Sequence, residues 1–171
     1  MRLDIVHWPD PVLSKGTKPV EKVDEDLNAV VAEMKRIMFD LRGVGLAAPQ
    51  VGVSKRMMLV CPSGDPGDET VVINPEILSR DGEDEMEEGC LSFPGLYGTV
   101  ARATSVHVKY RDLEWKEKDL ILEGFVGRVF QHEFDHLNGV VFITRMSPAD
   151  RMRHRTRLSD LEKKYAAKAT A

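Results

Sequence analysis

The sequence predicts an α+β fold in which antiparallel or mixed β-sheets pack around a central helix. Three observations indicate this class. The short apolar segments between residues 56 and 123 leave no room for the crossover helices that parallel strands require. The helical pattern at 124–138 is apolar nearly all round, which is typical of a helix inside a domain. Further helices are predicted at 25–41 and at about 148–164, near the two ends of the chain.

The first helix is predicted at 25–41, where apolar residues recur at helical spacing and form one stripe. Asp24 is suited to cap its N-terminus, and Gly43 is suited to terminate it. The segment GVGLAAPQVG at 43–52 follows. It is too rich in Gly and Pro to predict regular structure, so composition alone indicates a turn after the first helix.

Strands are predicted between the first helix and the helix at 124–138. The first two are continuous apolar runs, which indicates burial, and a cluster of Gly and Pro separates them. A later segment alternates apolar and polar residues, as a half-buried strand does. The predicted strands are 56–61, 70–74, one or two within 76–88, 104–111 and 119–123.

The composition argues against several classes of protein. Apolar residues make up 42% of the chain and charged residues 30%, which indicates a folded soluble protein rather than a disordered or membrane one. No apolar run is long enough for a membrane-spanning helix, and the first residues lack the apolar core of a signal peptide. We therefore expect a cytoplasmic protein without membrane contact, in which Cys61 and Cys90 are reduced.

Basic residues are concentrated near the C-terminus. Residues 145–171 carry eight Lys and Arg against three acidic residues, although the net charge of the whole chain is −4. Ser147 and Pro148 predict the N-terminus of a helix in this segment. A basic helix on an acidic body indicates a polyanionic partner, and the alternative is a solvated helix that merely balances charge.

The strongest chemical pattern is His-Glu-Phe-Asp-His, which begins at His132 inside the predicted helix 124–138. Residues four apart lie on one face of a helix, so His132 and His136 can bind one metal ion, and Glu133 can reach water at that ion. Two buried imidazoles that served only in packing would lack polar partners, which is costly. The pattern therefore predicts a metal site.

A catalytic site of this kind needs a third protein ligand and one open position. Cys90 is the best candidate because it lies in EEGCLSFPG, a segment with no helical pattern, where a thiolate would complete a Cys-His-His set. A loop cysteine without a role stays the alternative. The other candidates are His7, His107, His154, Glu162 and Cys61.

Three segments together resemble the motifs of the peptide deformylase family, namely GVGLAAPQ at 43–50, EGCLS at 88–92 and QHEFDH at 131–136. They occur in the family's order and at similar separations, and the resemblance covers nearly the whole chain. It implies one catalytic domain, 1–171, that removes the N-formyl group from the initiator methionine of nascent polypeptides and releases formate. The implied partners are N-formylmethionyl nascent peptides and the ribosome near the exit tunnel, through the basic helix, with no DNA or membrane.

The resemblance also assigns roles to residues. Cys90, His132 and His136 would hold one divalent metal ion, with iron(II) favoured and zinc, nickel or cobalt as alternatives. Glu133 would be the general acid and base, and the oxyanion would be bound by the Gln50 side-chain amide and the Leu91 backbone N–H. The peptide would add as a strand between Val44-Gly45 and Gly89. The methionine pocket would be lined by Val44, Glu88, Phe125 and Val129.

The chain departs from many bacterial members of that family at one position. They carry an Arg after the cysteine motif, near the bound substrate, where this chain has Leu96-Tyr97-Gly98. Tyr97 is expected to replace that contact through stacking or through its hydroxyl.

Two other classes of protein share parts of the pattern. A thermolysin-like zinc peptidase has the same His-Glu-x-x-His motif but would need Glu162 or His154 as its third ligand, and it leaves Cys90 unexplained. A non-catalytic ribosome-binding module with a structural metal would have no use for Glu133 or Gln50.

Overall fold

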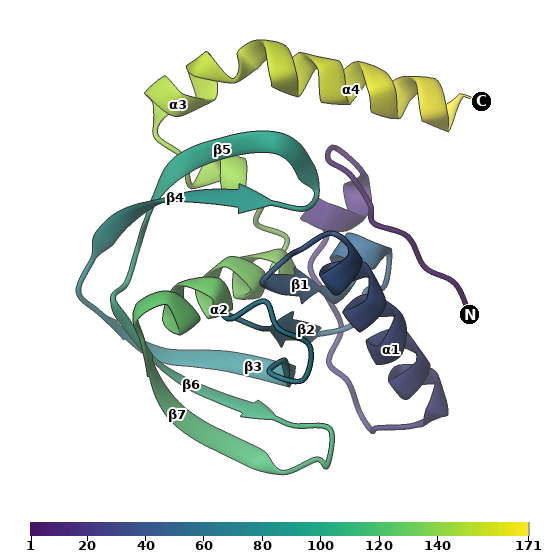
Figure 1. Cartoon of the computed structure of the whole chain (residues 1–171), viewed down its shortest axis with the longest axis vertical. Coiled ribbons are helices and arrows are strands. Elements are labelled where there is room, and N and C mark those ends of the chain that lie inside the picture. Colours follow the sequence, from purple (N-terminus) through teal and green to yellow (C-terminus); the bar gives the residue numbers. More distant parts are fainter. Residues whose placement is uncertain (171) are drawn as a thin grey trace.

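The computed structural model describes residues 1–170, and in it seven strands form two antiparallel sheets (Figure 1). The larger sheet has the strand order β1-β2-β3-β6-β7. The smaller sheet is the hairpin of β4 (Asp84–Cys90) and β5 (Phe93–Arg102). The strands of the larger sheet are β1 (Gly45–Ala47), β2 (Met57–Val60), β3 (Thr70–Asp81), β6 (Ser105–Arg111) and β7 (Glu117–Glu123). The predicted α+β class is confirmed.

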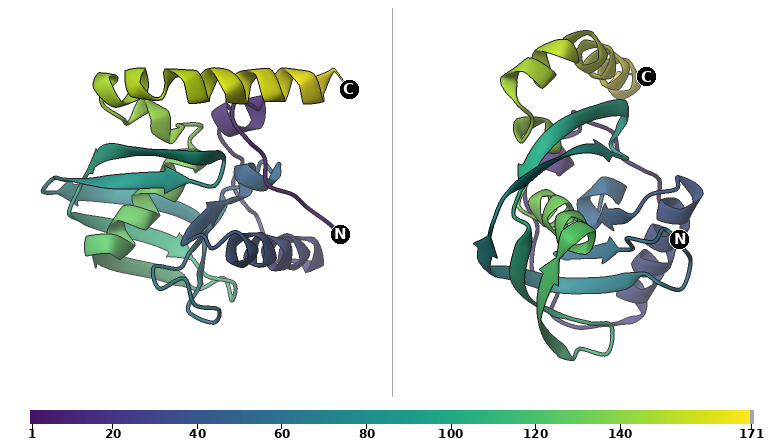
Figure 2. Two further views of the ribbon diagram at one scale, coloured as in Figure 1. Left: turned by 45° about the horizontal axis from the view of Figure 1, so that its top comes forward. Right: turned by 60° about the vertical axis from the view of Figure 1, so that its left-hand side comes forward.

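Helix α2 lies at the centre, between the larger sheet and the β4–β5 hairpin (Figures 1 and 2). Helix α1 packs on the opposite face of the larger sheet, and α4 runs along the outside of β5. No helix in the described part of the chain has the length and apolarity needed to span a membrane. The helices are α1 (Glu25–Asp40), α2 (Gly124–Leu137), α3 (Pro148–Arg153) and α4 (Arg155–Ala169), with 3-10 turns at Pro11–Ser14, Ala48–Val51 and Phe142–Thr144.

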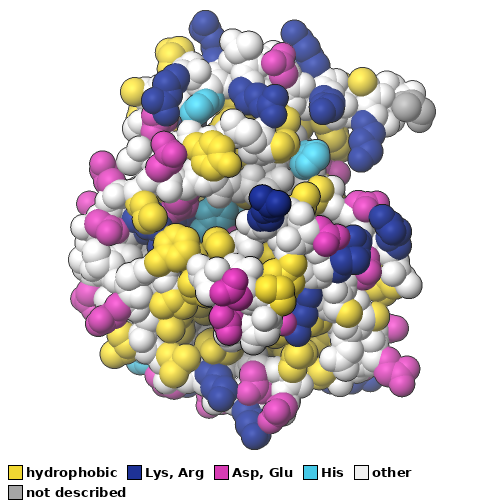
Figure 3. Space-filling view, in the orientation of Figure 1, with side chains coloured by type: hydrophobic (Ala, Val, Ile, Leu, Met, Phe, Trp, Pro, Cys, Tyr) yellow, Lys and Arg dark blue, Asp and Glu magenta, His cyan; other side chains and the backbone are white. Residues whose placement is uncertain are grey.

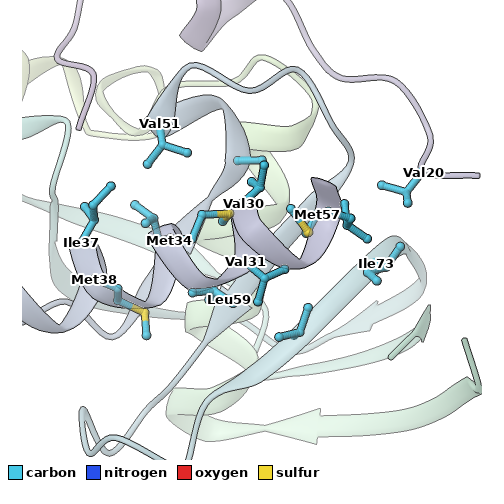
Figure 4. Close-up of a cluster of buried hydrophobic side chains, with 14 of the residues drawn as sticks. Val20, Val30, Val31, Met34, Ile37, Met38, Val51, Met57, Leu59 and Ile73 are labelled. Carbon is cyan, nitrogen blue, oxygen red and sulfur yellow. The ribbon is translucent and has the colours of Figure 1, made fainter. Parts of the chain in front are cut away.

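Strand β2 explains why the segment 57–61 is apolar throughout. Met57 and Leu59 belong to the cluster beneath α1, whereas Met58 and Val60 belong to the cluster beneath α2. Successive side chains of a strand point to opposite faces, so a strand covered on both faces has no polar side. Figure 4 shows the α1 cluster, in which side chains of the helix lie against those of the sheet.

A third apolar cluster attaches the β4–β5 hairpin to the C-terminal helices. Phe93 packs edge-on against Phe142, with ring centroids 5.2 Å apart, and Leu161 of α4 is buried in the same cluster. Polar bonds from the helices reach the backbone of β5. They are Arg157 to the Pro94 carbonyl, His154 to the Tyr97 carbonyl, and the Thr99 N–H to the Asp150 carboxylate.

Some predicted boundaries were wrong because Gly and Pro obscured extended backbone. The strand predicted at 70–74 is too short, since β3 continues through Pro75 to Asp81. The segment 76–88 does hold parts of two strands, as predicted, because β4 starts at Asp84. Pro75 does not end β3 because it lies at a break in the register between β3 and β6. Strand β5 was not predicted, although its residues alternate between buried and exposed positions.

Two further predictions needed correction. The segment 43–52 contains regular structure, because Gly45–Ala47 is extended and pairs with Met58–Val60 of β2. The C-terminal helix predicted at about 148–164 is two helices that meet at His154, and the second extends to Ala169.

Replacing Met34 with Ala should lower the free energy of unfolding by about 2–4 kcal/mol. Met34 is fully buried on the inner face of α1, and loss of its side chain leaves a cavity. Urea denaturation measures the change. The exposed Asn28 of the same helix provides the matched control, and its replacement with Ala should change stability by less than about 0.5 kcal/mol. Equal effects of the two substitutions would contradict the assignment of this cluster to the core.

Candidate metal centre

A cleft of about 450 Å³ lies between the start of β1, the β4–β5 hairpin and helix α2. Figure 3 shows a hollow in which a histidine side chain lies between apolar side chains. All the residues predicted for the site line this cleft except Gln50 and His136, which lie behind its surface. Residues far apart in the sequence are therefore brought to one place.

The structure brings one thiol and two imidazoles together at the inner end of the cleft. Cys90 lies at the end of β4, and His132 and His136 lie one turn apart on α2. One ligand atom from each lies within 4.8 Å of the others, and Cys90 Sγ is 3.3 Å from His136 Nε2. Among residues 1–170 no other group of three such donors could hold a metal ion.

The protonation of His136 suits a metal ligand. Burial lowers its pKa well below the ordinary value, and the positive charges of His132 and Arg102 lower it further. The ring is therefore neutral at pH 7. Its Nδ1 is buried and has no hydrogen-bond partner in the described chain. A thiol beside two imidazoles is a donor set that divalent transition metals prefer, so these residues fit a bound metal.

Glu88 holds the His132 ring in a defined orientation. Burial alone would raise the pKa of Glu88, but hydrogen bonds from His132 and Arg102 outweigh it and lower the pKa to about 2. Because the ionised carboxylate only accepts hydrogen bonds, His132 Nδ1, 2.9 Å from Glu88 Oε1, must carry the proton. Burial lowers the pKa of His132, but hydrogen bonds with Cys90 and Glu88 outweigh it and raise the pKa to about 10. Nε2 is then the nitrogen that would bind a metal, and a bound metal would displace its proton. The sequence had suggested for Glu88 only a place in the pocket wall.

Arg102 connects this carboxylate to a second buried one. It donates to Glu88 through Nε and Nη2, and to Asp135 through Nη1 at 2.9 Å. Arg145 also donates to Asp135. Asp135 is therefore paired with both arginines. Arg102 thus fixes the Glu88 carboxylate of β4 and the Asp135 carboxylate of α2 relative to each other.

Glu133 is buried beside the histidines. Its Oε1 lies 3.9 Å from His132 Nε2, and its Oε2 has no hydrogen-bond partner within residues 1–170. Burial raises the pKa of Glu133 to about 7, against the opposing effect of the positive charges of His132 and Arg102. A carboxyl group with a pKa near 7 can accept and donate a proton at physiological pH.

Gln50 directs its amide NH₂ at the same place. Its Oε1 accepts from the Ala47 N–H at 2.9 Å, which fixes the amide plane. Its Nε2 then donates to Ser92 Oγ at 3.2 Å and faces Cys90 Sγ at 3.6 Å. The sequence analysis did not single out Ser92, although it closes the EGCLS segment.

Arg128 is a second residue that the sequence analysis missed. It lines the cleft and is almost fully buried. Its position one helical turn before His132 was a usable signal, because residues four apart share a face. The predicted pocket face instead contained Phe125 and Val129, and both do line the cleft.

None of the other candidates for a third ligand joins this group of donors. His7 lines the cleft but is not part of the group, and His107 pairs with Asp119. His154 bonds to the Tyr97 carbonyl, and Glu162 is exposed on α4. Cys61 is buried in the cluster beneath α1. The thermolysin-like alternative therefore lacks its third ligand.

Strands with a single pairing partner border the cleft on two sides. β1 is the last strand at one edge of the larger sheet, and Gly89 of β4 lies across the cleft from Val44 and Gly45. Tyr97 lies over Gly89, where an added Cβ would be 2.6 Å from the Tyr97 ring. An extended chain could therefore lie between the two sheets.

Comparisons with known proteins give a consistent result. Residues 2–152 match the family model described as polypeptide deformylase. A peptide deformylase of Thermotoga maritima is 48% identical over 153 residues, covering 89% of this chain and 92% of that protein. The crystal structure of a plant peptide deformylase has a TM-score of 0.95 at 40% identity, covering 99% of this chain and 94% of that one. A Plasmodium falciparum peptide deformylase structure has a TM-score of 0.93 at 39% identity, covering 96% and 98%.

Replacing Gly45 with Ala should destabilise the protein by about 1–3 kcal/mol through overpacking. An added Cβ would lie 2.9 Å from Glu133 Cγ and 3.0 Å from Val129 Cγ1. The free energy of unfolding from urea denaturation measures the cost. In a Glu133→Ala background the first clash is absent, so the cost of Gly45→Ala should shrink. An equal cost in both backgrounds would contradict the contact.

Proposed function

The chain belongs to the peptide deformylase family, and on that premise we propose that Cys90, His132 and His136 hold its catalytic metal. The protein is a metal-dependent hydrolase that removes the N-formyl group from nascent polypeptides. The observation that carries the proposal is the thiol and two imidazoles, within 4.8 Å of one another, at the inner end of an apolar cleft. A divalent ion bound there would act as a Lewis acid and lower the pKa of water at the site.

Glu133 is the proposed general acid and base. It would accept a proton from the water that attacks the formyl carbon, and would give that proton to the amine as the C–N bond breaks. Formate and a free N-terminal amine are then the products. The pKa of about 7 that burial gives Glu133 supports both steps near neutral pH.

The negative charge that develops on the formyl oxygen needs hydrogen-bond donors. The proposed donors are the Gln50 Nε2 amide and the Leu91 backbone N–H. The fixed orientation of the Gln50 amide, which Ala47 and Ser92 hold, supports this role because a preorganised donor needs no rearrangement during the reaction.

The substrate is proposed to bind as an added strand between Val44-Gly45 and Gly89. The edge position of β1 supports this mode, because backbone bonds tolerate varied sequence after the methionine. The methionine side chain would lie among Val44, Phe125, Val129 and the stem of Glu88. Tyr97, which is 56% exposed beside the cleft, would stack on the residues that follow the methionine.

Iron(II) is the proposed native metal, with zinc, nickel or cobalt as other occupants. One thiolate and two imidazoles are suitable ligands for each of these metals. The affinity of such a site follows the Irving–Williams order, whereas the metal bound in the cell also depends on metal availability. The Cys90 ligand makes oxidation the expected route of inactivation for an iron form.

The basic helices α3 and α4 are proposed to contact the ribosome near the exit tunnel, and the protein is proposed to act in the cytoplasm. Exposed Arg151, Arg155 and Lys163 support contacts with RNA phosphates. The same helices also have a structural role, because Leu161 is buried against β5 and Arg157 bonds to the Pro94 carbonyl. A ribosome experiment must therefore leave those contacts intact.

Purified protein loaded anaerobically with iron(II) should release formate from formyl-Met-Ala-Ser, together with one free amine per formate. The zinc form should be less active. Formate and bound metal are measured in the same samples. Absence of formate release by the iron, nickel and zinc forms would overturn the proposed site.

The two cysteines provide a matched pair for that experiment. Cys90→Ala should lose tightly bound metal and formate release together, whereas Cys61→Ala, buried beneath α1, should keep both. Retention of stoichiometric metal by Cys90→Ala would exclude the thiol as a ligand.

Replacing Arg151, Arg155 and Lys163 with Ala should weaken co-sedimentation with ribosomes. Each lost phosphate contact should reduce the slope of log K against log salt concentration by about one. Lys15, Lys22 and Lys116, exposed on other elements, form the control set. Formate release should not change in either triple variant. Equal co-sedimentation of the two variants would contradict the proposed contact.

A further inference from the structure

Arg128 connects the two elements that carry the proposed metal ligands. It lies on α2 one turn before His132, and its guanidinium reaches β4, the strand that ends at Cys90. One nitrogen, Nη1, donates to Glu88 Oε2 at 2.5 Å and to the Val100 carbonyl of β5 at 3.0 Å. The other, Nη2, donates to the carbonyl and the carboxylate of Asp84, at 3.0 and 2.8 Å.

Arg128 forms two ion pairs that differ in burial, an inner pair with Glu88 and an outer pair with Asp84. The side chains of Arg128 and Glu88 are 5% and 7% exposed, whereas that of Asp84 is 60% exposed. Water screens the outer pair, so it contributes little to stability. The inner pair lies in an environment of low dielectric, where removing one partner leaves a buried charge uncompensated.

Glu88 is therefore held from three directions. Arg102 binds both of its oxygens, Arg128 binds Oε2, and His132 Nδ1 binds Oε1. Arg102 is anchored on its far side to Asp135, which lies on α2 itself. Arg102 therefore links β5 to α2, and Arg128 adds a second link in the opposite direction, from α2 to the backbone of β4 and β5.

Packing alone does not explain a charged residue at this position. The position faces a cleft in which Phe125 and Val129 of the same helix are apolar. An aliphatic side chain would fill the wall without the cost of desolvating a guanidinium. Arg128 differs from an aliphatic residue in its four hydrogen bonds, two from Nη1 and two from Nη2. Only a guanidinium can make this set of bonds.

We propose that Arg128 is a positioning residue of the metal centre, which acts through Glu88 to fix the His132 ring and to set β4, with Cys90, against α2. This inference rests on the proposed Cys90, His132 and His136 site. Loss of Arg128 would let Glu88 and the hairpin move relative to α2, and the three donors would then hold a metal less rigidly.

The experiment uses full-length protein loaded with cobalt(II), whose visible spectrum reports thiolate ligation and coordination geometry. Arg128→Met should shift the cobalt bands and release the metal to a chelator about 10-fold faster, which is the scale expected for residues that orient metal ligands. The release rate of Arg128→Lys should lie between those of the native protein and Arg128→Met, because an ammonium keeps the positive charge but lacks the paired N–H donors of a guanidinium. Arg111→Met, which removes an arginine bonded to the Trp115 carbonyl away from the cleft, should match the native protein.

A double-mutant cycle with Glu88→Gln tests the route of the effect. If Arg128 acts through Glu88, Arg128→Met should change metal release less than about twofold in the Glu88→Gln background, since interacting residues are not additive. A full effect in that background would overturn the proposed route. Native spectra and release rates in Arg128→Met would overturn the inference itself.

The outcomes separate this inference from the proposed site. Native protein without a thiolate–cobalt band, or Cys90→Ala with one, contradicts the site. A native protein with the band and an unchanged Arg128→Met contradicts only the role of Arg128. If Arg128→Met does not fold by circular dichroism, Arg128→Lys carries the same comparison, and a release rate equal to the native one decides against the proposal.

Discussion

The burial of one ionised carboxylate, Glu88, is the constraint on which the site depends. An anion inside a domain is tolerated only when its hydrogen-bonding capacity is fully used, and here two guanidiniums and one imidazole use it. These partners must come from α2 and from β5, so the carboxylate fixes how helix and hairpin meet. The same contacts orient the His132 ring, whose Nε2 would bind the metal. Structural stability and site geometry are therefore properties of one cluster.

The sequence was sufficient where chemistry is local and insufficient where it is distant. His132, Glu133 and His136 are neighbours on one helix, so spacing alone indicated their common face. Cys90 lies more than forty residues away, so spacing could not place it with them. It was the best candidate for a third ligand, and the resemblance of three segments to a family then favoured it over a loop cysteine without a role. Arg128 escaped notice because its partners are on strands whose register no local pattern reveals.

The fold itself was predictable for similar reasons. Buried strands such as β2 and the apolar helix α2 have strong periodic patterns, and these segments were found with small errors at their ends. Strand β5 was missed because Pro94, Gly95 and Gly98 resemble loop residues, although the cluster around Phe93 and the pairing with β4 keep it extended. Tertiary contacts, rather than intrinsic propensity, determine such strands.

The attachment of α3 and α4 to β5 has an evolutionary consequence. Arg157 and His154 bond to the carbonyls of Pro94 and Tyr97, so the outer wall of the cleft is held through its main chain. Main-chain anchors persist whatever side chain the anchored residue carries. The side chain at position 97 can then be exchanged without loosening the wall. Contacts with a substrate at this wall can thus change while the hydrolytic apparatus behind it keeps its geometry.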